Sequence, residues 1–248
     1  IPELSEGKSF EINATDFVRG LKSVWYSSSV SSMKPELSSV YIYQEDGYFV
    51  FAATDSFRLA EQKVKMNVSD FERVLIPYKN VTEIIRVLEG STGTVLVHMN
   101  KNQIAFSFPS TYLTSRTVDG VFPDYRQIIP KEFKTEAVVL KEDLVRSLKV
   151  ATIFSDTFNQ VSVALGPKEK KFELTTKNSN LGENATLLEA ALTGEGIAVN
   201  FNYRYIADCL QSISTDSITL SFAGPGRPVV IRGVGDRNFT YLVMPMNR

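Results

Sequence analysis

The chain has 248 residues, of which 43% are hydrophobic and 22% are charged, and this is enough for two globular domains of about 120 residues each. Its formal net charge of −1 excludes a bulk polycation as the basis of nucleic-acid binding, so any charge that matters must be local. No apolar run approaches bilayer length and one cysteine, Cys209, excludes an internal disulfide, so we expect a cytoplasmic protein with no membrane partner.

The first half of the chain is predicted to contain two amphipathic helices and several strands. Thr15 to Tyr26 carries apolar residues at helical spacing along one face. Ser27 to Leu37 is polar and Ser-rich, which indicates a loop. A second helix is expected from Ile76 to Leu88. The expected strands are Val40 to Tyr43 and Tyr48 to Ala52, which form a hairpin, then Thr94 to Met99, Gln103 to Phe108 and Tyr112 to Thr117.

The second half repeats this order after a turn-rich break at Gly120 to Tyr125. Helices are expected at Lys141 to Phe154 and at Tyr203 to Ile213. The expected strands are Val161 to Leu165, Lys171 to Thr176, Thr186 to Thr193, Ile218 to Phe222, Val229 to Arg232 and Thr240 to Met244. The sequence therefore predicts two α+β domains, 1–129 and 130–248, each with two helices packed on about seven strands.

Two sequence matches link the halves directly. Asp16 to Val24 returns as Asp143 to Ala151 at an offset of 127, and Tyr78 to Val81 returns as Tyr203 to Ile206 at an offset of 125. Matches in the same order indicate one domain fold used twice. A duplicated domain is a natural unit for a symmetric assembly.

Cations recur on the repeated helices. Arg19 and Lys22 lie three residues apart on one helix face, and the offset of 127 places Arg146 and Lys149 at the same positions. These side chains are either ordinary solvated charges or a surface for a phosphate backbone. Phosphate contacts of this kind are independent of base sequence and weaken with salt.

The sequence offers little to a catalytic reading. His98 and Cys209 are the only residues of their types and lie far apart, so a metal site or a Cys–His dyad has little to build on. The carboxylates Asp55, Asp119 and Asp124 are explained by turns and caps. We predict no enzyme activity, no catalytic residue, no cofactor and no metal. A hydrolase that uses these carboxylates is the weakest of the functional hypotheses.

Three segments resemble the bacterial DNA polymerase III beta subunit, the beta sliding clamp. Ala53 to Ala60 is similar to that family's Ala-Thr-Asp-[Ser/Gly]-His-Arg-Leu-Ala segment, Leu113 to Tyr125 to the junction of its second and third domains, and Tyr241 to Met246 to its C-terminal tail. The resemblance implies two tandem copies of the DNA-clamp domain, an arc of a ring, corresponding to the second and third domains only. The start at Ile1 rather than Met agrees with a fragment or a processed product.

The resemblance also implies a non-catalytic processivity factor. In the family, three domains per protomer and two protomers close a ring around double-stranded DNA, so we expect a homodimer at full length and sequence-independent DNA binding. Basic helices line the hole of the ring, and some relatives contact DNA through the loop that here holds Lys34. The residues implied to face DNA are Arg19, Lys22, Lys34, Lys79, Arg146, Lys149 and Arg204.

DNA polymerases and the clamp loader dock on the family's clamp through short peptides of the Gln-x-x-Leu-Phe kind. Phe57 replaces the family's usual His, and Gln127 stands where a basic residue is common; both could reshape the pocket. A competing reading makes residues such as Leu59 and Val243 plain core. The matching positions are Leu37, Thr54, Ser56, Phe57, Arg58, Leu59, Pro123, Gln127, Ile128, Pro228, Val230, Leu242, Val243, Met244, Pro245 and Met246.

Two other assignments compete with the clamp fragment. A monomeric peptide-binding adaptor would use the duplicated domains only as a scaffold and would not encircle DNA. A eukaryotic-type clamp, with two domains per protomer and three protomers per ring, fits the chain length. The quoted motifs match the bacterial family instead.

Overall fold

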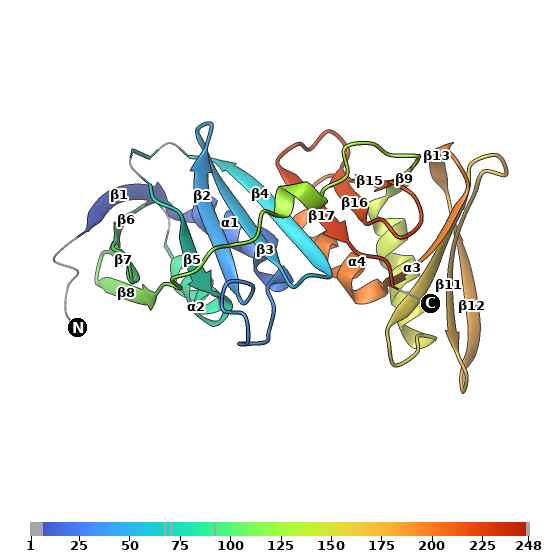
Figure 1. Cartoon of the computed structure of the whole chain (residues 1–248), viewed down its shortest axis with the longest axis horizontal. Helices are drawn as coiled ribbons and strands as arrows, with labels where there is room; N and C mark the ends of the chain where they lie inside the picture. The colour runs from blue at the N-terminus through green and yellow to red at the C-terminus, as the bar shows by residue number, and fades with distance from the viewer. Residues whose placement is uncertain (1–6, 67, 70, 92, 247–248) are drawn as a thin grey trace. The chain divides into compact units, whose positions relative to one another are not determined.

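The chain forms two units, Ile1–Asp124 (unit 1) and Tyr125–Arg248 (unit 2) (Figure 1). The computed structural model describes residues 7–66, 68–69, 71–91 and 93–246. The expected domain boundary lies after residue 129. The two units divide after Asp124, directly before the short 3-10 helix η2, Tyr125–Ile128.

Unit 1 consists of two antiparallel layers of strands with two helices. The strand orders are β1-β6-β7-β8 and β4-β3-β2-β5. Helix α1 contacts β3, β4 and α2. The elements are β1 Lys8–Asn13, α1 Ala14–Val24, η1 Trp25–Ser27, β2 Ser39–Glu45, β3 Tyr48–Thr54, β4 Arg58–Lys65, β5 Val74–Pro77, α2 Tyr78–Leu88, β6 Thr94–Met99, β7 Gln103–Phe108 and β8 Thr111–Arg116.

The core of unit 1 joins α1 to both layers. The Phe17 ring lies 5.4 Å from the ring of Phe51 in β3 and 5.5 Å from that of Phe106 in β7. Leu21 is fully buried on the same helix face. Burying side chains of this size contributes roughly 1.5–3 kcal/mol each. Gly20 is required at its position because a Cβ there would collide with the Phe51 ring.

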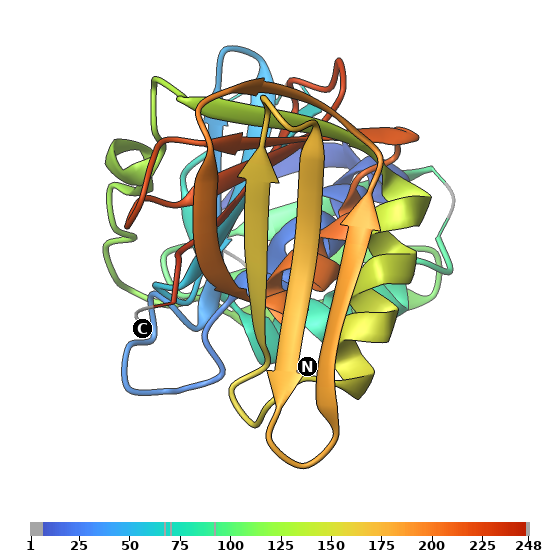
Figure 2. The same cartoon turned by 90° about the vertical axis from the view of Figure 1, so that its right-hand side faces the viewer.

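Unit 2 has the same order of elements with one strand more. Its strand orders are β12-β11-β10-β14 and β13-β9-β15-β16-β17; Figure 2 shows the first of these layers with α3 beside it. Helix α3 contacts β9, β11, β12 and α4. The elements are β9 Thr135–Leu140, α3 Lys141–Ile153, β10 Gln160–Gly166, β11 Lys171–Asn178, β12 Gly182–Leu188, β13 Ala190–Gly194, β14 Ile197–Asn202, α4 Tyr203–Cys209, η3 Leu210–Ser212, β15 Ser217–Phe222, β16 Val229–Gly233 and β17 Phe239–Val243.

The structure places the helices of both units at the positions that the predicted repeat gives them. Helix α1 begins 127 residues before α3, and α2 begins 125 residues before α4, which are the two offsets read from the sequence. In both units the first helix follows the first strand; the second helix follows the fifth strand in unit 1 and the sixth in unit 2. The strands pair in the corresponding orders, with β13 as the additional strand of unit 2. The prediction of two tandem α+β domains is therefore confirmed.

Several element boundaries differ from the prediction. Ile76 and Pro77 belong to β5 and not to the second helix, because this short apolar run is buried beside β2. The strand expected from Thr186 to Thr193 is interrupted at Glu189: β12 pairs with β11, whereas β13 pairs with β9 in the other layer. Strands β1, β4, β9 and β14 were not predicted. No helix in the described part of the chain is long and apolar enough to cross a membrane.

Candidate functional site

The repeated cations of the first helices are exposed in both units. On α1, the apolar side chains of Phe17, Leu21 and Val24 are buried, and Arg19 and Lys22 lie on the solvent side. On α3, Leu144, Leu148 and Ala151 are buried, and Arg146 and Lys149 are exposed. The prediction that the Arg–Lys pair lies away from the core is therefore confirmed in both units.

Most of these cations have an acidic neighbour within their own unit. Arg19 Nη2 lies 2.9 Å from Asp16 Oδ1, three residues earlier on α1. Arg146 Nη2 lies 2.6 Å from Asp143 Oδ1 at the same spacing on α3. Lys22 forms an ion pair with Glu89, the residue that follows α2. Arg19, Lys22 and Arg146 are thus paired charges and not bare ones.

The second helices carry Lys79 and Arg204, both exposed at their N-terminal ends. Burial of the Tyr203 phenol favours its neutral form, but hydrogen bonds from Arg204, Ser155 and Thr152 outweigh this and lower its pKa. The same contact, with Arg204 Nε donating to the Tyr203 hydroxyl at 3.4 Å, raises the pKa of Arg204. The guanidinium is therefore charged and held near the start of α4.

One further cation was missed by the sequence reasoning. Arg86 is exposed on α2, seven residues after Lys79, so both side chains lie on the same helix face. Arg86 Nη2 lies 2.7 Å from Glu83 Oε2. Its spacing of seven residues from Lys79 could have identified it from the sequence.

Lys34 lies outside the helices, at an exposed position in the segment between η1 and β2. Its carbonyl oxygen accepts from the backbone N–H groups of Leu37 and Ser38, and Ser29 N–H donates to the Leu37 carbonyl across the base of the segment. Val30 and Met33 in this segment are 81% and 88% exposed. The segment therefore projects Lys34 beside two apolar side chains.

The unit 1 residues matched to the peptide pocket are centred on the turn between β3 and β4. Asp55 Oδ1 accepts from the N–H groups of Phe57 and Arg58, and Asp55 Oδ2 accepts from Arg58 Nε at 3.0 Å. Thr54 Oγ1 donates to the Arg58 carbonyl and accepts from Ser56 N–H. Ser56 has a φ of 78°, which explains why a Ser/Gly position suits this turn. The turn role expected for Asp55 is confirmed.

These side chains differ widely in exposure. Phe57 is 62% exposed, whereas the Arg58 side chain is only 12% exposed because it folds back onto Asp55. Leu37 and Leu59 are buried in unit 1, and Pro123 is exposed. Phe57 is thus the side chain of this group that a ligand could reach most readily.

The unit 2 residues of the predicted pocket lie on β16, β17, η2 and the tail. Val230 and Leu242 are register partners in the β16–β17 pair, and both are buried, as are Pro228 and Val243. Gln127 and Ile128 are exposed on η2. The tail residues Met244, Pro245 and Met246 are partly exposed, and Met246 N–H donates to the carbonyl of Asn200 in β14 at 2.8 Å.

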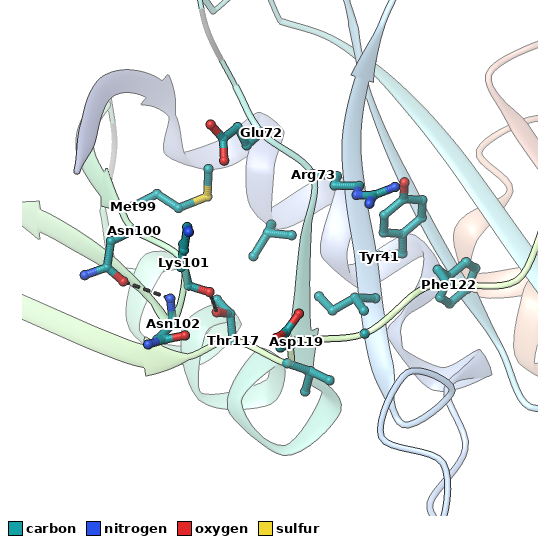
Figure 3. Close-up of a pocket in the computed structure, with 14 residues that line it drawn as sticks. Tyr41, Glu72, Arg73, Met99, Asn100, Lys101, Asn102, Thr117, Asp119 and Phe122 are labelled. Atoms are coloured by element: carbon teal, nitrogen blue, oxygen red, sulfur yellow. Dashed lines mark hydrogen bonds between the residues drawn. The ribbon is translucent and has the colours of Figure 1, made fainter.

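Unit 1 also contains a cavity of about 580 Å³ between the start of β5, the β6–β7 turn and the segment after β8 (Figure 3). Tyr41 and Phe122 stack at one side with ring centroids 4.9 Å apart. The lining carries two cations and two carboxylates, Arg73, Lys101, Glu72 and Asp119, so it selects neither anions nor cations. It includes none of the predicted site residues.

Catalytic groupings have little support in the described residues. Among them, no three His, Cys, Asp or Glu side chains come together in a way that could hold a metal ion. His98 Nδ1 lies 2.7 Å from Ser9 Oγ across the β1–β6 pair, and Cys209 is buried in α4.

Sequence comparison assigns both units. Residues 11–124 match the central domain of the DNA polymerase III beta subunit, and residues 126–247 match its C-terminal domain. The chain belongs to the DNA polymerase III beta subunit family. The beta-clamp resemblance, restricted to the second and third domains, is therefore confirmed, and the expectation of a non-catalytic polymerase subunit agrees with this membership.

Named relatives of the beta clamp family cover nearly all of the chain. The chain is 28% identical to the beta sliding clamp of Synechococcus elongatus and 27% identical to that of Bacillus subtilis, over 99% of its own length in each case. It spans 67% and 66% of those relatives, which is about two thirds of their length. The crystal structure of the Thermotoga maritima DNA polymerase III beta subunit superposes on the whole chain with a TM-score of 0.93 at 25% identity, covering 68% of that protein.

Proposed function

We propose that this protein is part of a sliding clamp that encircles double-stranded DNA and tethers replicative and repair polymerases and the clamp loader. The observation that carries the proposal is the exposed Arg–Lys pair at equivalent positions of α1 and α3, within two domains of the beta clamp family. Exposed cations at repeated positions suit a phosphate backbone without selecting a base sequence.

Encirclement would explain how a chain of net charge −1 holds DNA. A closed ring retains DNA by topology, so individual phosphate contacts need only be weak. A full-length homodimer supplies this closure in the proposal, and the protein contributes no catalysis of its own. As a bacterial replication factor it would act in the cytoplasm.

Retention on DNA tests this part of the proposal. A three-domain version of the protein should remain on closed circular DNA after loading and should be lost once the circle is cut. Gel filtration of DNA-bound protein before and after linearisation measures this. Equal loss from circular and linear DNA contradicts encirclement, and equal loss combined with intact peptide binding favours the monomeric adaptor.

Polymerases and the clamp loader would dock through the residues matched to the family pocket. In unit 2, Met244 and Met246 offer flexible, polarizable contacts and Ile128 offers an exposed apolar one, while Phe57 is an accessible aromatic of unit 1. A peptide of the Gln-x-x-Leu-Phe kind would bury a Leu and a Phe, and about −8 kcal/mol, or micromolar affinity, is expected after ordering costs.

A titration with a fluorescent Gln-x-x-Leu-Phe peptide tests the docking residues. Met244→Ala, or truncation after Tyr241, should abolish measurable binding. Met33→Ala is the matched control, because Met33 is 88% exposed and lies outside the predicted pocket. Unchanged affinity in the Met244 variant, or equal loss in the Met33 variant, rejects the assignment.

A further inference from the structure

The exposed arginine of each first helix is accompanied by an aspartate three residues before it. Asp16 lies 2.9 Å from Arg19 on α1, and Asp143 lies 2.6 Å from Arg146 on α3. Both aspartates are the third residue of their helix and are separated by the repeat offset of 127. The feature that occurs in both units is therefore the Asp–Arg ion pair, and not the arginine alone.

The two members of each pair differ in how far they reach into solvent. The Arg19 and Arg146 side chains are 60% and 71% exposed, whereas those of Asp16 and Asp143 are 35% and 32% exposed. The carboxylate is held close to the helix, near the positive N-terminal end of the helix dipole. The guanidinium extends past it, so an anion approaching the arginine also meets a fixed negative charge.

Helix stability alone is a weak reason for the repeated pair. Exposed ion pairs contribute little to folding. Other pairs differ between the units. Lys22 is paired with Glu89, and Arg86 with Glu83, but the positions at the offset of 125 from Glu83 and Arg86 are Asp208 in α4 and Gln211 in η3. Of the helix ion pairs described above, the Asp–Arg pair is the one that occurs at the same position of both units.

We propose that Asp16 and Asp143 are built-in counter-ions that keep the contacts of Arg19 and Arg146 with DNA phosphates weak. This proposal rests on the proposed function. A guanidinium has five N–H donors, so it can bridge its own carboxylate and a phosphate, but the two anions repel each other. Each arginine then releases fewer counter-ions from DNA than a free arginine would, and the protein moves along the duplex with less drag.

The test compares two variants with the same change in net charge. Asp16→Asn/Asp143→Asn removes the two helix carboxylates, and Glu72→Gln/Glu173→Gln removes two carboxylates from ion pairs outside the helices, with Lys8 at 2.8 Å and Lys171 at 3.1 Å. Both raise the net charge of the chain by two. Each is introduced into the three-domain protein and loaded on circular DNA.

The readouts are the salt dependence of the affinity for linear DNA, measured without loading, and the diffusion constant of the loaded protein along DNA from single-molecule tracking. The Asp variant should steepen the slope of log affinity against log salt by up to about 4, as expected for up to four additional phosphate neutralisations in the homodimer, and should diffuse more slowly. The Glu variant should leave both values close to those of the parent protein. Equal effects in the two variants, or an unchanged slope in the Asp variant, overturn the proposal.

Removal of the arginines provides an independent measurement. Arg19→Gln/Arg146→Gln should flatten the salt slope only slightly in the parent protein, and by up to about 4 in the homodimer when the aspartates are already Asn. Additive effects contradict the counter-ion role. If the parent protein is lost equally from circles and cut circles, the proposed function fails and takes this inference with it. Retention on circles with an unchanged slope overturns the inference alone.

Discussion

The two units hold the same pair of helices by different local means. In unit 1 the first helix has a side-chain cap, since Asn13 Oδ1 accepts from Asp16 N–H at 3.0 Å, and the second helix follows Pro77 without one. In unit 2 the first helix follows Leu140 without a side-chain cap, and the second has one, since Asn202 Oδ1 accepts from Arg204 N–H at 3.0 Å. The repeated fold therefore depends on the buried faces, because the caps are exchanged between the helices.

The helix cores show a second difference of this kind. Gly20 in α1 leaves room for the ring of Phe51, whereas the equivalent position in α3 is Ser147, whose hydroxyl donates to the Asp143 carbonyl at 2.8 Å. Phe17 of unit 1 is likewise replaced by Leu144 in unit 2. A larger aromatic core in unit 1 is thus combined with a smaller residue on the helix.

The largest effect should come from removing the core side chains of the first helices. Phe17→Ala should destabilise unit 1 by about 3–5 kcal/mol, and Leu144→Ala should destabilise unit 2 by about 2–5 kcal/mol. Each substitution leaves a cavity beneath its helix, because both side chains are buried. Denaturant unfolding, with hydrogen exchange to locate the loss, measures both. A loss below about 1 kcal/mol in either unit contradicts the common dependence on buried faces.

Exchanging the small residues should give a smaller and unequal effect. Gly20→Ser should destabilise unit 1 by about 1–3 kcal/mol, because the added side chain collides with Phe51. Ser147→Gly should cost only about 0.5–1 kcal/mol, mainly through backbone entropy. Thermal unfolding of the two variants compares them, and the idea fails if Gly20→Ser is as mild as Ser147→Gly.

Changing the caps should have a modest effect of opposite sign in the two units. Asn13→Ala should cost about 0.5–2 kcal/mol in unit 1, and Leu140→Asn should stabilise unit 2 by a part of that range, since it supplies the missing cap and removes a 53% exposed Leu. Asn202→Ala serves as the control for a capped helix in unit 2. Denaturation midpoints that shift in the same direction for Asn13→Ala and Leu140→Asn contradict the exchange of caps.

The smallest effect concerns acid stability and is confined to unit 1. A hydrogen bond from Lys8 and its charge, with a further contribution from Lys101, lower the pKa of Glu72 below its ordinary value of 4.5. The unfolded chain then takes up this proton first, so the contribution of Glu72 is present above pH 4.5 and is lost as the pH falls through the lower folded value. Glu72→Gln should remove this increment of the pH–stability curve, and Lys8→Met should remove most of it. A curve unchanged by either substitution contradicts the assignment.

Much of the fold could be predicted because the helix faces are regular. The offsets of 127 and 125 fixed the equivalence of the helices, and alternation fixed strands such as Thr94–Met99. Strand β4 was not recognised because Glu61 and Gln62 are polar and yet buried, so its sequence shows neither alternation nor a continuous apolar run. The change of layer at Glu189 depends on pairing with β9, which local sequence does not encode.

The candidate site was predictable where it lies on helices. Helical spacing placed Arg19 and Arg146 on the exposed face, but the pairing of Lys22 with Glu89 joins two helices and has no local signal. For the residues matched to the peptide pocket, the sequence left open whether Leu59 and Val243 are core residues; the structure buries both, whereas Phe57 is exposed. That distinction arises from tertiary packing.

The interruption at Glu189 has a mechanical consequence for unit 2. Strand β12 belongs to one layer and β13 to the other, and a single residue of continuous main chain joins them. Tension applied to β12 is therefore delivered directly to β9 through the β13–β9 hydrogen bonds, without passing through the side chains between the layers. Unit 1 has no such strand among its described residues, and packing such as that of Phe17 against Phe51 and Phe106 joins its layers, so it should shear apart under a smaller force.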